Sequence, residues 1–131
     1  QNIQARGNAA EGFVTVAGYS PDLDTPENKK FTSDFQKKTN ATPGLYGADS
    51  YGVVYFYKAA VEKAGGTDTD AVRTAMRGLT WDTPQGKKEM RAGDHQAIMD
   101  VYVLQVKDGR FTIVDKIKGA DAAGADTCER F

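Results

Sequence analysis

The apolar positions along the chain follow two different periods, which together predict one strand, three helices and a closing hairpin. Residues 11–19 are rich in β-forming side chains and bounded by glycines, so they predict a leading strand. A first helix is predicted over residues 25–40. Thr25 suits its N-cap and Pro26 suits its first helical position.

A second, longer helix is predicted from Asp49 to Ala64, with Gly65 supplying a left-handed stop. Its apolar positions keep a 3.6-residue period: Val53, Val54, Tyr57, Ala60, Val61 and Ala64. Residues 43–48 before it contain two glycines and one aromatic residue, Tyr46, and predict a flexible loop. A third, short helix follows, capped by Asp68 or Thr69.

Turn and strand signals dominate the chain from residue 80 onward. The predicted elements are a turn over 82–86, an exposed strand over 87–91, a strand over 97–106 buried on both faces at its centre, and a returning strand over 111–117. Asp108-Gly109 between the last two strands is a strong hairpin signal. The tail over 119–131 is predicted to be irregular.

This order of elements indicates an α/β chain in a single region. One leading strand is too little sheet to cover three helices. Two completions are open: the closing hairpin pairs with the leading strand, or chain outside this sequence completes the sheet.

Composition narrows the functional classes. Of the 131 residues, 40% are apolar and 27% charged, with a net charge of −1, which is ordinary for a globular protein. The lysine pairs are interspersed with acids, so no basic face points to nucleic acid. No apolar run approaches the roughly 18 residues of a membrane span. Because the chain begins at Gln1 without a signal pattern, we expect a processed chain or a piece of a longer one.

The single cysteine, Cys128, cannot form an internal disulfide or a metal site by itself. It is either a free thiol or the partner of a cysteine on a part of the protein outside this sequence. Asp22, Asp24 and Glu27 are close in sequence but lack the glycine and the spacing of a calcium loop. The sequence therefore predicts no metal and no cofactor.

A serine hydrolase is one hypothesis for the region around Ser50. Residues 48–52 fit a relaxed nucleophile-elbow pattern, and His95 follows downstream with acids between them. That mechanism needs a buried strand directly before the serine. Residues 42–47 contain two glycines and a proline and do not predict one, so the hypothesis is remote.

Ligand binding without chemistry is better supported at the same place. Tyr46 combines a large contact surface with a hydroxyl group, and a helix N-terminus close by favours anions such as carboxylates. The competing interpretation of Tyr46 is hydrophobic packing beneath its loop.

A family resemblance rests on motifs that occur in order from residue 10 to residue 119. They are Ala10-Glu11-Gly12, Thr25-Pro26-Glu27-Asn28 with Phe31 and Phe35, Pro43 with Tyr46-Gly47-Ala48-Asp49-Ser50-Tyr51, Glu62-Lys63-Ala64-Gly65-Gly66-Thr67-Asp68, Ala71-Val72-Arg73-Thr74-Ala75-Met76, Trp81-Asp82-Thr83-Pro84-Gln85-Gly86, Asp94-His95-Gln96, and Val106-Lys107-Asp108-Gly109-Arg110-Phe111. The series resembles the closing portion of the branched-chain-amino-acid-type solute-binding proteins. These are type I periplasmic binding proteins of ABC importers.

The resemblance implies part of a two-lobe fold that closes by hinge motion around an amino acid, amide, urea or aromatic acid. Residues 12–80 then correspond to the N-terminal lobe, and residues 81–131 to the last crossover, hairpin and tail. The implied partners are the small ligand, a membrane permease and the rest of the same protein. The implied location is periplasmic or otherwise extracytoplasmic, and a ligand sensor of the same fold is the alternative function.

By position in the motif, Tyr46 matches an aromatic residue that lines the ligand cleft in this family. Tyr51 and Asp49 are the neighbouring candidates for ligand contact. Tyr51 is also a candidate for packing. Asp49 and Ser50 depart from the small residues often found before that tyrosine, which leaves the ligand open.

Overall fold

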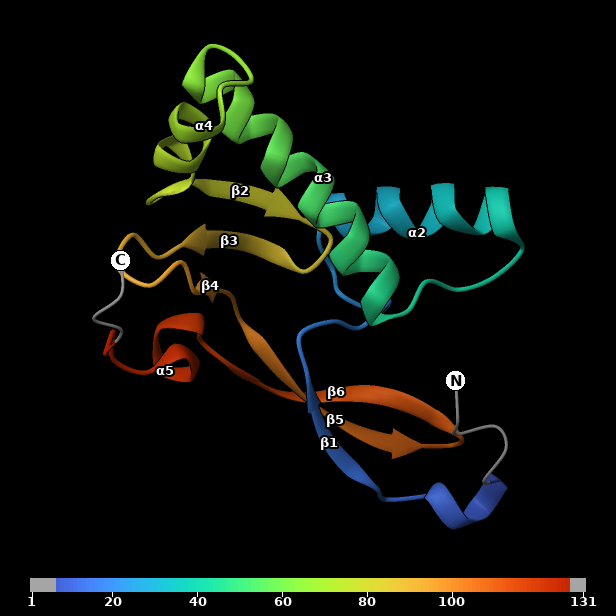
Figure 1. Cartoon of the computed structure of the whole chain (residues 1–131). Helices are drawn as coiled ribbons and strands as arrows, with labels where there is room; N and C mark the ends of the chain where they lie inside the picture. Colours follow the sequence, from blue (N-terminus) through green and yellow to red (C-terminus); the bar gives the residue numbers. More distant parts are fainter. Residues whose placement is uncertain (1–6, 128–131) are drawn as a thin grey trace.

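The computed structural model describes residues 7–127, which form several helices and two small, separate sheets (Figure 1). Three helices, α2, α3 and α4, gather beside one sheet, and the other sheet extends away from them. The elements in chain order are the 3-10 helix η1 (Gly7–Ala10), β1 (Val14–Ala17), α2 (Pro26–Thr39), α3 (Leu45–Ala64), α4 (Thr69–Met76), β2 (Thr80–Thr83), β3 (Gly86–Met90), β4 (Ala97–Ile98), β5 (Val101–Lys107), β6 (Arg110–Ile117) and α5 (Gly119–Ala123). Cys128 lies outside the described residues.

Both sheets have three antiparallel strands, in the orders β1-β5-β6 and β2-β3-β4. The leading strand β1 pairs with β5 of the closing hairpin, with Val16 opposite Val103. This pairing confirms the first of the two completions expected from the sequence. The hairpin turn at Asp108-Gly109 is also confirmed.

The capping signals of α2 and α4 are confirmed. The Thr25 hydroxyl accepts a hydrogen bond from the Asn28 backbone N–H at 3.1 Å, and Asn40 ends α2 with a left-handed φ of 53°. The Asp68 side chain accepts from the Ala71 backbone N–H at 3.0 Å and caps α4.

The predicted start of α3 is wrong by four residues, because the helix begins at Leu45 and not at Asp49. Gly44 serves as N-cap with extended backbone angles, a role that glycine fills well. A Cβ at Gly47 would lie 3.6 Å from the Phe35 ring, an ordinary packing distance, so α3 lies against α2 at this position. Both glycines, which indicated a loop, therefore belong to the helix and its cap.

The buried face of α3 also differs from the predicted apolar positions. The residues of α3 that are buried are Ala48, Gly52, Phe56 and Ala60. Val53, Val54 and Tyr57 are exposed instead. The 3.6-residue period identified the helix correctly but not the face that the described residues cover.

The predicted strand over 97–106 is broken into β4 and β5, which belong to different sheets. The break lies at Asp100, whose carboxylate accepts a hydrogen bond from the Gly119 backbone N–H at 2.9 Å and pairs with Lys116 at 2.5 Å. A Cβ at Gly119 would lie 2.8 Å from the Met99 carbonyl carbon, so only glycine fits this approach. The start of the tail, predicted to be irregular, forms the short helix α5.

Two details of the strand predictions also need correction. The centre of β5 is buried on one face only, by Tyr102, Leu104 and Val106, while the intervening residues stay half-buried. The strand predicted to be exposed, now β3, buries Lys88.

The main core joins the end of β1, α2, α3 and β5. Its buried members are Tyr19, Leu23, Phe31, Ala48, Tyr102 and Leu104. Phe31 lies at its centre, with ring centroids 6.3 Å from Tyr19 and 4.8 Å from Tyr51. Tilted and edge-on aromatic pairs at these separations are favourable beyond the area they bury.

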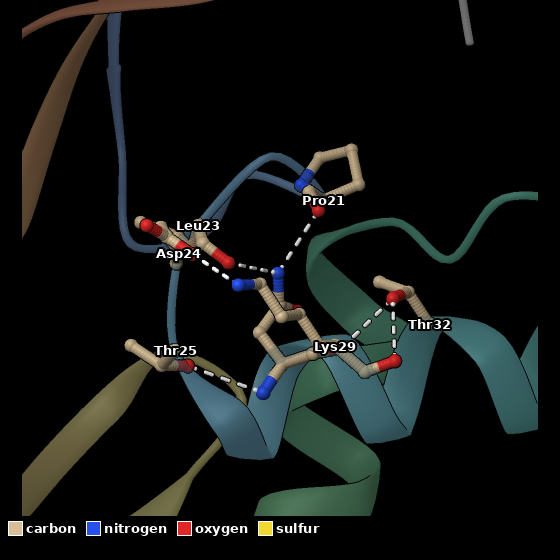
Figure 2. A network of polar contacts seen from close by, with 7 residues as sticks. Pro21, Leu23, Asp24, Thr25, Lys29 and Thr32 are labelled. Carbon is tan, nitrogen blue, oxygen red and sulfur yellow. Dashed lines mark hydrogen bonds and ion pairs between the residues drawn. The ribbon is translucent and has the colours of Figure 1, made fainter.

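Asn28, in the first turn of α2, is only 1% exposed and ties the helix to the linker after β1. Its amide donates to the backbone carbonyls of Pro21 and Leu23, both at 2.9 Å, and its oxygen accepts from the Tyr19 hydroxyl at 3.0 Å. Figure 2 shows the two carbonyls turned toward the start of the helix. Burial of the Tyr19 ring raises the pKa of its hydroxyl, which remains a hydrogen-bond donor at neutral pH.

Replacing Asn28 with alanine should therefore lower the free energy of unfolding by about 2–4 kcal/mol, because three buried polar groups lose their partner. Urea denaturation followed by circular dichroism measures this loss. Ser33→Ala on the exposed side of the same helix is the control and should stay within about 0.5 kcal/mol of the parent chain. Equal stability of the two variants would contradict the role of Asn28.

Candidate ligand-binding site

Tyr46 lies in the first turn of α3, and its side chain is 84% exposed. No side chain caps this end of the helix, and the first turn contains no acidic residue. The backbone N–H groups at a helix N-terminus lack intrahelical partners and carry a partial positive charge. An exposed aromatic ring therefore lies beside a helix end that is suited to a carboxylate.

Asp49, in the second turn of α3, has partners within the protein. Its carboxylate accepts a hydrogen bond from the Gln85 side-chain amide at 2.8 Å and lies 3.6 Å from the Lys88 ammonium group. The Lys88 side chain is 9% exposed, and burial lowers its pKa while Asp49 partly opposes that shift. Asp49 thus holds a buried cation and the β2–β3 turn against α3.

Gln85, the partner of Asp49, is 1% exposed and lies in the turn between β2 and β3. Its backbone carbonyl accepts from the Tyr102 hydroxyl at 3.2 Å, which links the turn to β5. A Cβ at Gly18 would lie 3.7 Å from the Gln85 amide nitrogen and 2.6 Å from the Met99 terminal methyl. The turn therefore lies against the linker after β1, residues 18–21, and that linker in turn lies against Met99 of the linker between β4 and β5, residues 99–100.

Neither Gln85 nor Lys88 was identified as a site residue from the sequence. Proline and glycine around Gln85 correctly indicated a turn, but a turn is expected to face solvent. Alternation along β3 gave no sign that Lys88 would point inward. Asp49 was predicted from the sequence only as a candidate for ligand contact, so its pairing with Lys88 and Gln85 was not foreseen.

Tyr51 packs in the aromatic core. Its ring centroid lies 4.7 Å from that of Tyr55, and its hydroxyl donates to the Tyr55 hydroxyl at 3.3 Å. That hydrogen bond, with burial, raises the pKa of Tyr51 to about 12. The three candidates Tyr46, Asp49 and Tyr51 thus share the first two turns of α3, and Tyr46 has the most accessible side chain.

The serine hydrolase hypothesis lacks its structural setting in the described residues. Ser50 lies inside α3, five residues after the helix begins, and not on a turn that follows a strand. Because the helix starts at Leu45 and not at Asp49, Ser50 lies in its second turn. His95 lies between β3 and β4 with a left-handed φ of 58°.

Among residues 7–127, no three histidine, cysteine, aspartate or glutamate side chains come together as a metal site would require. Within the same residues, no helix has the length and apolar character that crossing a bilayer demands.

The family comparison agrees with this fold. A family model described as a periplasmic binding protein matches residues 1–110. The chain belongs to the periplasmic binding protein family. Its helices and two antiparallel sheets form part of the type I periplasmic-binding-protein fold expected from the sequence.

A named solute-binding protein is similar to this periplasmic binding protein in sequence. The leucine-, isoleucine-, valine-, threonine- and alanine-binding protein of Pseudomonas aeruginosa is 31% identical over 80 residues, which cover 61% of this chain and 21% of the relative.

Two solved structures from Rhodopseudomonas palustris are also similar. An ABC-type branched-chain amino acid transporter protein has a TM-score of 0.75 and 31% identity, covering 82% of this chain and 31% of its own. A solute-binding protein in complex with 3,4-dihydroxybenzoic acid has a TM-score of 0.83 and 26% identity, covering 93% of this chain and 35% of its own. The chain therefore spans between about a fifth and a third of the length of these relatives.

Replacing Asp49 with alanine should lower the free energy of unfolding by about 1–3 kcal/mol at pH 7, because the buried groups of Lys88 and Gln85 lose their partner. Asp82→Ala is the matched control, since Asp82 is exposed and lies 3.9 Å from the exposed Lys87. That control should change stability by less than about 0.5 kcal/mol.

The loss caused by Asp49→Ala should shrink as pH rises from 7 toward 10. Without Asp49, the pKa of Lys88 falls further in the folded chain, so the folded chain binds fewer protons than the unfolded chain over this range. Its free energy of unfolding then rises with pH relative to that of the parent. A difference between variant and parent that stays constant across this range would contradict the Asp49–Lys88 pairing.

Proposed function

We propose that the complete protein is an extracytoplasmic solute-binding component of an ABC importer. It captures its ligand without covalent chemistry, by closure of two lobes about their linkers. The family membership over residues 1–110 supports this class of function. A membrane permease is the corresponding protein partner.

The proposed ligands are amino acids or small aromatic acids. The observation that carries this proposal is Tyr46, 84% exposed beside a helix N-terminus that no side chain caps. An aromatic ring covers an apolar side chain or a benzene ring, and the free N–H groups favour a carboxylate. Among the relatives, one is named for binding leucine, isoleucine, valine, threonine and alanine, and another was solved with 3,4-dihydroxybenzoic acid. Both kinds of ligand carry a carboxylate.

We propose that the closure motion takes place about two linkers. Residues 18–21 and 99–100 connect the helical body to the sheet β1-β5-β6. We assign α2, α3 and α4 to the N-terminal lobe, as residues 12–80 were expected to contribute. The hairpin in 81–131 then belongs to the return across the linkers. Asp49 lies close to these linkers through Gln85, so we propose that it supports the site, with Tyr46 as the direct contact.

The test is a thermal-shift screen of the protein expressed from its complete gene against amino acids, amides, urea and benzoates. We expect a stabilising shift from at least one carboxylate ligand, because binding to the folded state alone raises the melting temperature. A screen in which urea or an amide stabilises the protein and no carboxylate does would reject the proposed ligand class.

In the same complete protein, Tyr46→Ala should weaken the affinity for the carboxylate ligand found in that screen by about 10-fold or more, as removal of a central aromatic contact does. Titration calorimetry measures the change, and Tyr46→Phe separates the ring from the hydroxyl group. Lys58→Ala, at an exposed position further along α3, is the control and should leave affinity unchanged. Unaltered affinity of Tyr46→Ala would remove Tyr46 from the site.

A further inference from the structure

Met99 lies where three crossings of the chain meet. Residues 18–21 and 99–100 lead to and from the β1-β5-β6 sheet, and the step from β6 to α5 is a third crossing, because α5 contacts β4 of the other sheet. A Cβ at Gly18 would lie 2.6 Å from the Met99 terminal methyl, and a Cβ at Gly119 would lie 2.8 Å from the Met99 carbonyl carbon. The middle crossing therefore lies in contact with the other two.

The two contacts of Met99 differ in kind. Its backbone makes the contact with Gly119, whereas the far end of its side chain makes the contact with Gly18. A methionine side chain is unbranched and has three rotatable bonds, so it can keep filling an irregular gap when the walls of that gap move. The Met99 side chain is half-buried, so it takes part in the packing between the first and second linkers.

Gly18 also lies close to the candidate ligand site. The Gln85 amide nitrogen lies 3.7 Å from the Cβ position at Gly18 and donates a hydrogen bond to Asp49 at 2.8 Å. Asp49 follows Tyr46 by three residues on α3, so their side chains are neighbours on the helix surface. A continuous series of contacts thus joins Met99 to the helix that carries Tyr46.

We propose that the Met99 side chain is a spacer between the linkers that sets the affinity for every ligand without contacting any ligand. This inference rests on the proposed function, because it takes the lobes to close about these linkers. A spacer that restricts the lobes before binding reduces the entropy lost on closure. Removing the spacer lowers the fraction of binding-competent protein, and that fraction is common to all ligands.

The first test is a substitution in the protein expressed from its complete gene. Met99→Ala should raise the dissociation constants of all ligands found in the thermal-shift screen by the same factor, at least about 5-fold, as titration calorimetry measures. Met76→Ala is the matched control, because Met76 is also half-buried but ends α4, outside both linkers. It should leave the dissociation constants unchanged. Circular dichroism checks that each variant is folded.

Gly18→Ala tests the same contact from its other side. The new Cβ displaces only the flexible end of the Met99 side chain, so this variant should fold and should lose affinity for all ligands as Met99→Ala does. Because both substitutions act on one contact, the double variant should bind no more weakly than Met99→Ala alone.

Energy transfer between two dyes gives a readout that needs no ligand. Lys38→Cys and Lys107→Cys attach the dyes at exposed positions of α2 and β5, on the two sides of the linkers, with every other cysteine replaced by serine. In the ligand-free protein, Met99→Ala should change the mean transfer efficiency, because the lobes are held less tightly. Met76→Ala should leave it unchanged.

Unchanged affinity after Met99→Ala would overturn the proposal. An effect on one ligand alone would also overturn it, because Met99 would then act by direct contact with that ligand. Fully additive losses from Gly18→Ala and Met99→Ala would show two separate contacts and reject the spacer as well. If no ligand stabilises the parent protein, the proposed function fails. The energy transfer then decides the inference by itself, and an efficiency equal to that of the parent rejects it.

Discussion

Two linkers carry the chain between its sheets, and their buried polar groups must find hydrogen-bond partners to be stable there. Asn28 supplies them for the first linker by donating to the carbonyls of Pro21 and Leu23. Asp100, in the second linker, accepts from the backbone N–H of Gly119 and so ties that linker to the start of α5. The rest of the layout depends on these two side chains, because they fix where the helical body ends and the β1-β5-β6 sheet begins (Figure 1).

The β2–β3 turn adds a further set of contacts between the helices and the β1-β5-β6 sheet. Gln85 reaches Asp49 on α3 through its side chain and Tyr102 on β5 through its backbone carbonyl. A single buried turn thereby contacts both halves of the described chain. Its position gives Asp49 a structural role that is compatible with a place near the ligand, because Tyr46 lies one turn away on the same helix.

How much could be predicted from the sequence depended on how local the determining interaction was. The start of α2 was predictable, because Thr25, Pro26 and the cap they form are adjacent in the chain. The start of α3 was not, because Gly44 and Gly47 indicate a loop until Phe35 is known to lie against Gly47. The break at Asp100 likewise depends on Gly119, a residue 19 positions away.

The candidate site follows the same rule. Tyr46 was predicted from its motif and stays a prediction, while Lys88 and Gln85 became visible only as partners of Asp49. The apolar period of α3 predicted a helix, yet it could not show which of two apolar faces the chain itself covers. That choice depends on the residues that pack against the helix, such as Trp81 of β2 against Phe56, which no periodicity within the helix contains.

Gly18 and Gly119 both lie against Met99, but they differ in how easily another residue could replace them. At Gly18 the nearest obstacle to a side chain is the mobile terminal methyl of Met99, so a shorter residue at 99 would make room for alanine. At Gly119 the obstacle is the Met99 backbone, which every amino acid shares. A substitution at position 18 can therefore be compensated by a second mutation at position 99. A substitution at position 119 cannot, because it also requires a change in the backbone of the linker.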